Sequence, residues 1–251
     1  WYNGSGEDWE TQGYREAGVA HGMWQVAGDH GHHSRVGGYL SYAPAALRAE
    51  GFTYLAGLEG TSGAALGRWG PSLFAIRVDA SVPAGGRLPA AALLCHDSEA
   101  HAPAGWWIGD KVSGAVWIET ETKHAVLLFL RQKLGATWYG EADVGGDPYG
   151  GGKGYHAEGY ELKAWIYDPD DLLAVHRRER EPWSLSPVEK VPLTTRSPGS
   201  TDETYHSVFT GTAIDELQVS LRDGRLIVLQ PDGYRPGIYE GMPKGHVFDL
   251  D

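Results

Sequence analysis

The stretch that decides the fold class is residues 216–230, which read ELQVSLRDGRLIVLQ. Its first half alternates polar and apolar residues, as a strand with one buried face does. Asp223-Gly224 then favours a two-residue hairpin turn, because both positions of such a turn need positive φ. The second half is almost wholly apolar, which predicts a returning strand buried on both faces. The sequence therefore predicts an antiparallel hairpin.

Similar strand patterns precede this hairpin along the chain. We expect about three four-stranded antiparallel units, at residues 17–79, 88–168 and 188–251. Repetition of such units favours a β-propeller over an irregular β-sandwich or jelly roll, which is the alternative. The prediction is a single all-β, β-propeller-like domain. Its expected strands are 22–27, 38–43, 52–59 and 72–78, then 91–96, 114–119, 124–131 and 162–167, then 189–195, 216–222, 225–230 and 246–250.

Three units fall short of the roughly four to eight blades of a closed propeller. We therefore expect the chain to be part of a larger propeller, completed by a segment before Trp1 or by another chain. One helix is predicted after residue 168, where Asp168-Pro169-Asp170-Asp171 combines an N-cap, an early proline and acidic residues.

Composition restricts the partners. The formal net charge of −12 argues against nucleic acid, whose binding depends on clustered Lys and Arg. No apolar run approaches the roughly 18 residues of a membrane helix. The single cysteine, Cys95, rules out an intrachain disulfide and is expected to be buried. Abundant Trp, Tyr and Gly with few Lys, and a chain that opens at Trp1, predict a processed, extracytoplasmic or secreted protein.

The long connections are expected on one face. In an antiparallel unit the chain reverses at every turn, so the first-to-second and third-to-fourth connections emerge together. Function concentrates in such loops on a rigid scaffold. The connections expected on this face are residues 28–37, 60–71, 97–113, 132–159, 196–209 and 231–245.

The glycine-rich part of residues 132–159 supplies the catalytic candidates. Lys153, Tyr155 and His156 place a cation, a phenol and an imidazole within four residues. His and Tyr can act as general acid or base, and Lys153 or Arg35 could neutralise a substrate carboxylate. The alternative is a glycine-rich loop whose Tyr and His only pack at its rim.

Two kinds of metal site are left open. Asp29, His30 and His32 could offer oxygen and nitrogen ligands to a transition metal, although no second ligand pair at diagnostic spacing follows. Calcium could be bound by loop carboxylates, or two of them could form a glycosidase pair. Those carboxylates are Glu141, Asp143, Asp147 and Glu158.

Aromatic and imidazole side chains on the same loops suit a sugar, because its apolar ring faces stack while its hydroxyls form hydrogen bonds. The alternative is packing between blades, where Trp supplies large buried area. The candidates for substrate binding are His33, Trp69, Trp106, Trp107, Trp138, Tyr139, Tyr205 and His206.

Two segments resemble uncharacterised bacterial β-propeller-like repeat proteins. They are KGYHAEGY at residues 153–160 and WIYDPDDL at residues 165–172, and the closing strands 225–230 and 246–248 are similar in style. The resemblance covers mainly residues 125–251. It implies a repeat fold and no particular activity or catalytic residue.

The sequence therefore predicts a ligand-binding β-propeller that is carbohydrate-active, of the polysaccharide lyase or glycoside hydrolase type. Its partner would be a polysaccharide or another small polar ligand. The alternative is a non-catalytic module that binds a glycan or a protein, or supports assembly.

Overall fold

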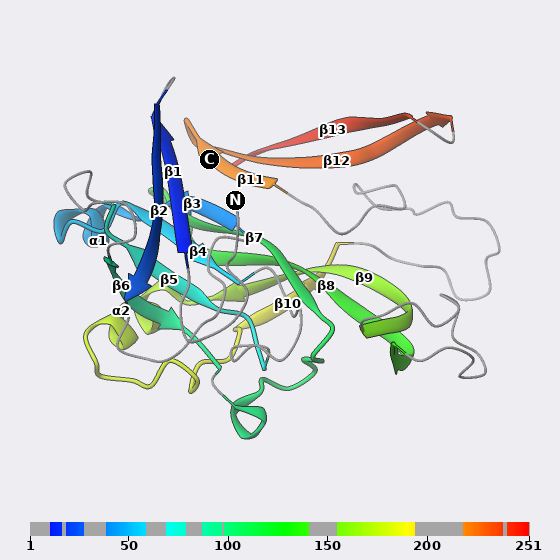
Figure 1. Ribbon diagram of the computed structural model, residues 1–251, viewed down its shortest axis with the longest axis horizontal. Helices are drawn as coiled ribbons and strands as arrows, with labels where there is room; N and C mark the ends of the chain where they lie inside the picture. Colours follow the sequence, from blue (N-terminus) through cyan, green and yellow to red (C-terminus); the bar gives the residue numbers. More distant parts are fainter. Residues whose placement is uncertain are drawn as a thin grey trace.

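A computed structural model describes residues 11–16, 19–27, 39–58, 69–78, 87–96, 98–140, 155–193, 218–237 and 240–250. For the first two strands and the outer parts of the last two, only the backbone is described. These residues form three β-sheets with two short α-helices, which confirms the all-β class (Figure 1). Within them, no helix has the length and apolar character needed to span a membrane.

The first sheet has six strands. Their spatial order is β1 (Thr11–Glu16), β2 (Val19–Ala27), β6 (Arg87–Leu94), β5 (Leu73–Ile76), β4 (Tyr54–Gly57) and β3 (Tyr39–Tyr42). All neighbours pair antiparallel except β2 and β6, which are parallel. A short helix that the sequence did not predict, α1 (Ala45–Ala49), connects β3 to β4.

The second sheet is a four-stranded antiparallel meander. It runs β7 (Lys111–Glu119), β8 (His124–Tyr139), β9 (Tyr155–Tyr167) and β10 (Glu189–Pro192). A 3₁₀ turn, Glu99–His101, lies in the connection from β6 to β7. The predicted helix is confirmed as α2 (Pro169–His176), and the Asp168 carboxylate accepts a hydrogen bond from the Asp170 backbone N–H at its start.

The third sheet has three strands, β11 (Gln218–Arg222), β12 (Arg225–Gly237) and β13 (Glu240–Asp249). The Asp-Gly hairpin is confirmed: Arg222 pairs with Arg225, and both turn residues have positive φ, 51° for Asp223 and 72° for Gly224. The long loop predicted at residues 231–245 is wrong. β12 and β13 continue through it, and the pairing register shifts between Gln230 and Tyr234, where Pro231 lacks a backbone N–H.

The predicted grouping of strands into units is also wrong. Every predicted strand has a counterpart, and β1 was not predicted. The strand expected to open the second unit (β6) is paired in the first sheet, and the one expected to open the third unit (β10) is paired in the second. Strand β2, expected to open the first unit, pairs with β1 and β6 and not with β3. Residue alternation identifies a strand and its buried face but not its partner. Among the described strands no sheet closes on itself.

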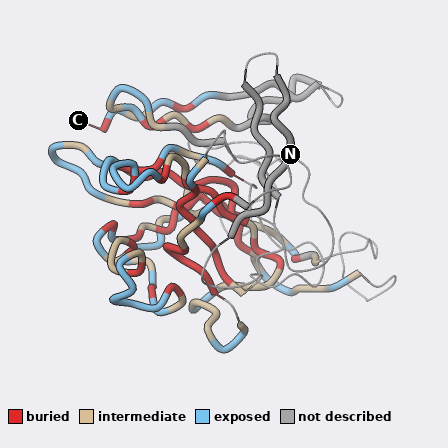
Figure 2. The backbone as a smooth tube through the Cα atoms, turned by 60° about the vertical axis from the view of Figure 1, so that its left-hand side comes forward, coloured by how far each residue is buried: buried red, intermediate tan, exposed pale blue. Residues whose placement is uncertain are grey.

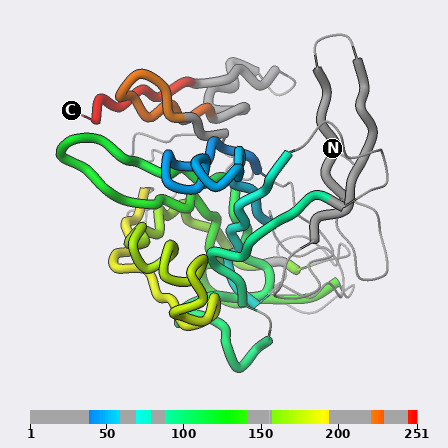
Figure 3. Tube along the Cα trace, turned by 90° about the vertical axis from the view of Figure 1, so that its left-hand side faces the viewer, coloured from blue at the N-terminus to red at the C-terminus, as the bar shows by residue number. Residues whose placement is uncertain are grey.

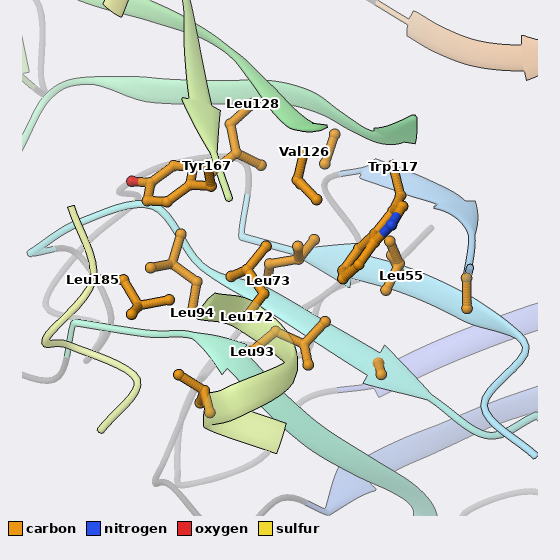
Figure 4. Packing of buried hydrophobic residues seen from close by; sticks show 14 of the residues in the cluster. Leu55, Leu73, Leu93, Leu94, Trp117, Val126, Leu128, Tyr167, Leu172 and Leu185 are labelled. Atoms are coloured by element: carbon orange, nitrogen blue, oxygen red, sulfur yellow. The ribbon is translucent and has the colours of Figure 1, made fainter. Parts of the chain in front are cut away.

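The second sheet lies between the other two. One of its faces packs Trp117 and Leu128 against Leu55 and Leu73 of the first sheet (Figure 4). Trp165 belongs to the same core. Helix α2 adds Leu172 and Val175 to this core, and Leu185 joins it. Each strand therefore offers alternate residues to two interfaces, which explains why the middle of β8 is buried on both faces.

The opposite face of the second sheet packs against the third sheet. Val116, Ile118 and Phe129 meet Leu226 and Val228 there. Buried residues consequently run through the centre of the molecule, while the third sheet lies along one side (Figures 2 and 3). The structure is a stack of three sheets in which β3, β7 and β11, the first strand of each meander, lie next to one another.

Candidate functional site

The far end of the β8–β9 hairpin bears an aromatic cluster formed by Trp107, Tyr139 and Tyr155. Tyr139 pairs with Tyr155 across the two strands, and their ring centroids are 4.6 Å apart with planes tilted by 52°. Trp107, from the β6–β7 connection, meets the Tyr155 ring edge-on at 5.7 Å and 85°. Two of the connections predicted to share one face therefore do meet.

The cluster has an exposed surface and a cation. The Tyr139 side chain is 55% exposed, while Trp107 and Tyr155 are half-buried. Lys133, six residues before Tyr139 in β8, places its ammonium nitrogen 5.9 Å from the centre of the Trp107 ring. The arrangement combines flat apolar surface, phenol hydroxyls and one positive charge, which can bind a ring-shaped polar molecule.

A buried carboxylate holds Trp107 in place. Asp110 is fully buried, and its Oδ2 accepts hydrogen bonds from the Trp107 backbone N–H at 2.9 Å and from Gln132 Nε2 at 3.2 Å. Its Oδ1 accepts another from the Lys133 backbone N–H at 2.8 Å. Burial raises the pKa of the Asp110 carboxyl, although these hydrogen bonds and the Lys133 charge act in the opposite direction.

Gln132 extends this network into the core. Its Nε2 also donates to the Gly105 carbonyl at 2.9 Å, and its Oε1 accepts from the indole N–H of Trp165 at 3.3 Å. Gly109 matters for the same loop, because a Cβ there would lie 2.0 Å from the Trp107 ring. The loop that presents Trp107 is thus fixed to β8 by buried polar contacts and by close packing on a glycine.

A β-bulge shapes the outer part of the hairpin. The pairing register of β8 and β9 shifts between Leu134 and Thr137, and Gly135 has a φ of 69°. The Glu158 carboxylate accepts a hydrogen bond from the Ala136 backbone N–H at 3.3 Å. The bulge changes the twist of the hairpin before it reaches Tyr139 and Tyr155.

The remaining predicted binding residues are not in this cluster. Trp106 packs edge-on against the buried Trp165 ring at 6.0 Å, so it belongs to the core between the first two sheets. Trp69 is half-buried beside Gly70, in the turn before β5. Trp138 is half-buried in β8, and its backbone partner is His156.

Several predicted residues lie outside the described part of the chain. The backbone of His156 is placed in β9, but its side chain is not described. The residues that lie wholly outside are Arg35, Lys153, His33, Tyr205 and His206, together with the metal-ligand candidates Asp29, His30, His32, Glu141, Asp143 and Asp147. In the described ranges, no group of three or more His, Cys, Asp and Glu side chains is arranged to hold a metal ion.

Sequence reasoning missed Asp110, Gln132 and Lys133, which support the aromatic cluster from the Trp107 loop and from β8. Two of them had a signal in the sequence. Gln132 and Lys133 are polar residues that directly follow the apolar run of β8, and a buried polar side chain needs a hydrogen-bond partner. The predicted burial of Cys95 is confirmed. Comparison with known proteins adds no assignment, since no protein-family model, no curated protein and no solved structure matches this chain.

Proposed function

We propose that this protein binds a carbohydrate, and that the aromatic cluster of Trp107, Tyr139 and Tyr155 is the binding surface. The observation that supports the proposal is the Tyr139 ring, 55% exposed yet held against Tyr155 by a paired backbone. A large exposed ring held at a fixed angle costs little conformational entropy when a sugar stacks on it. Lys133 favours a glycan with carboxylate groups.

The described side chains of this cluster support ligand binding, and binding is the function that we propose. Asp110 is the carboxylate that contacts the Trp107 backbone, and it is fully buried with three hydrogen bonds. It therefore orients the loop and is not available to transfer a proton to a ligand. Acid–base catalysis by Tyr155 and His156, with Arg35 or Lys153, stays a prediction.

The stacked sheets also support a propeller-like arrangement, which we include in the proposal. Successive blades of a propeller pack face to face, and their first strands lie nearest the axis. Here β3, β7 and β11 adjoin, and the second sheet packs against its neighbours on both faces. On this proposal a further blade, from another part of the chain or another chain, would pack on the third sheet, where Val247 is 61% exposed.

The test compares two exposed tyrosines. We expect Tyr139→Ala to weaken binding of an acidic polysaccharide such as polygalacturonate by about tenfold, the loss expected for one stacked ring with its contact area. Tyr42→Ala, which removes an exposed tyrosine of β3 in the first sheet, should leave that affinity unchanged. Isothermal titration calorimetry with polygalacturonate, and with dextran as the neutral glycan, measures both.

Equal losses from the two variants would contradict the proposed site. Absence of binding to every polysaccharide of a broad panel would contradict the proposed function. Turnover of a polysaccharide that disappears in Tyr155→Phe, with binding retained, would instead establish the catalytic alternative.

A further inference from the structure

A cavity of about 750 Å³ lies where the first strands of the three sheets meet, and it is separate from the aromatic cluster. Its walls come from β3 and the start of α1, from the last part of β7, and from Leu221 of β11. β7 ends at Glu119, beside the turn to β8, whereas Tyr139 lies at the opposite end of β8. The volume is in the range of small-molecule sites, roughly 300 to 1,000 Å³.

One wall of the cavity is apolar and exposed. Tyr42 and Tyr54 pair across β3 and β4, and their rings stack with centroids 5.4 Å apart and planes 28° from parallel. Tyr42 is 69% exposed and Leu40 is 41% exposed. Such side chains gain free energy when a ligand with an apolar group covers them.

The cavity also has one cation and one anion that are not paired. Arg48 of α1 and Glu119 of β7 both line it, and both are exposed. In the part of the chain that the structure describes, neither side chain makes an ion pair or hydrogen bond. An unpaired guanidinium is well suited to bind a carboxylate, and an unpaired carboxylate to bind an ammonium group.

We propose that this cavity binds a small zwitterionic molecule with an apolar side group, the chemistry of a free aromatic amino acid. The ligand carboxylate pairs with Arg48, its ammonium group pairs with Glu119, and its ring lies against Tyr42 and Tyr54. A ligand of this kind contacts both unpaired charges and the exposed Tyr42 ring at the same time. It goes beyond the carbohydrate site and does not depend on it.

Three related ligands test the proposal by calorimetry or by saturation-transfer NMR. L-phenylalanine has both charges, phenethylamine lacks the carboxylate, and 3-phenylpropionate lacks the ammonium group. We expect L-phenylalanine to bind about tenfold more tightly than either analogue, because each loses one charge-assisted hydrogen bond. Equal binding of the three ligands, or no binding of L-phenylalanine, would overturn the proposal.

Variants then assign each charge to its residue. Arg48→Gln should abolish the preference over phenethylamine, and Glu119→Gln should abolish the preference over 3-phenylpropionate. Glu121→Gln is the matched control, since Glu121 is exposed in the β7–β8 turn and does not line the cavity. Tyr139→Ala should also leave L-phenylalanine binding unchanged. Retention of both preferences in the Arg48 and Glu119 variants would disprove the site, and circular dichroism confirms that each variant is folded.

Discussion

The two ends of the second sheet use charged residues in opposite ways. At the end near Tyr139, Asp110 is fully buried and accepts three hydrogen bonds that fix the Trp107 loop to β8. At the other end, Arg48 and Glu119 are exposed around a cavity and have no partner in the described part of the chain. The carboxyl group at the first end holds a loop in place through hydrogen bonds, whereas the charged groups at the second end are free to bind a ligand.

The largest expected effect comes from removing one carboxylate at each end. We expect Asp110→Ala to lower the free energy of unfolding by about 3 kcal/mol, because it leaves buried donors on Trp107, Gln132 and Lys133 without an acceptor. Glu119→Ala should change it by less than about 0.5 kcal/mol. Urea denaturation measures both, and similar losses would show that the two ends do not differ in this way.

Two glycines with positive φ, one near each end, extend the comparison to the backbone. Gly135, in the bulge of β8, has a φ of 69°, and an added Cβ would lie 2.1 Å from the Glu158 carboxylate. Gly51, after α1, has a φ of 91°, and its added Cβ would lie 3.0 Å from the end of the Arg77 side chain. Both substitutions by alanine should cost about 1 kcal/mol for the left-handed conformation.

Gly135→Ala should cost about 1 kcal/mol more than Gly51→Ala, because the Glu158 side chain must also move. Adding Glu158→Ala to Gly135→Ala should recover that excess and no more. Thermal or urea unfolding of the three variants measures the effect. An excess that survives in the double variant would mean that the contact with Glu158 is not its cause.

The smallest expected effect is a pH dependence that belongs to the Asp110 end alone. Burial is the main cause that raises the pKa of Asp110 above its ordinary value of 3.8. The folded chain therefore holds this proton more tightly than the unfolded chain does. The contribution of Asp110 to the free energy of unfolding is then largest below pH 3.8 and declines as the pH rises through the raised pKa.

The asparagine side chain does not titrate, so Asp110→Asn isolates the effect of protonating Asp110 on stability. The difference in free energy of unfolding, native chain minus variant, should decrease as the pH rises through that window and level off above it. Denaturant titrations at several pH values give this difference. A difference that increases with pH would show that the hydrogen bonds to Asp110 outweigh its burial.

Neighbouring residues show how far the sequence leads to the site. Trp106 and Trp107 are equivalent in sequence, yet Trp106 packs on Trp165 in the core while Trp107 contacts Tyr155 in the aromatic cluster. Tyr139 and Tyr155 were predicted as site residues in a long loop. They lie close together because β8 and β9 stay paired further along the chain than the sequence predicted. Chain reversal explains why the two connections meet. The positions of Trp106 and Trp107 depend on the hydrogen bonds that hold their loop, which involve Asp110 and the distant residue Gln132.

The sequence by itself determined the strands from β2 to β13, the α2 helix and the Asp223-Gly224 turn, because each depends on local periodicity, capping or backbone conformation. Only the tertiary structure decided which strands share a sheet and which side chains form the cluster and the cavity. β6 and β10 have the pattern of strands in any unit, and nothing in that pattern specifies a partner. Partner choice depends on packing in the assembled sheets and not on any one segment.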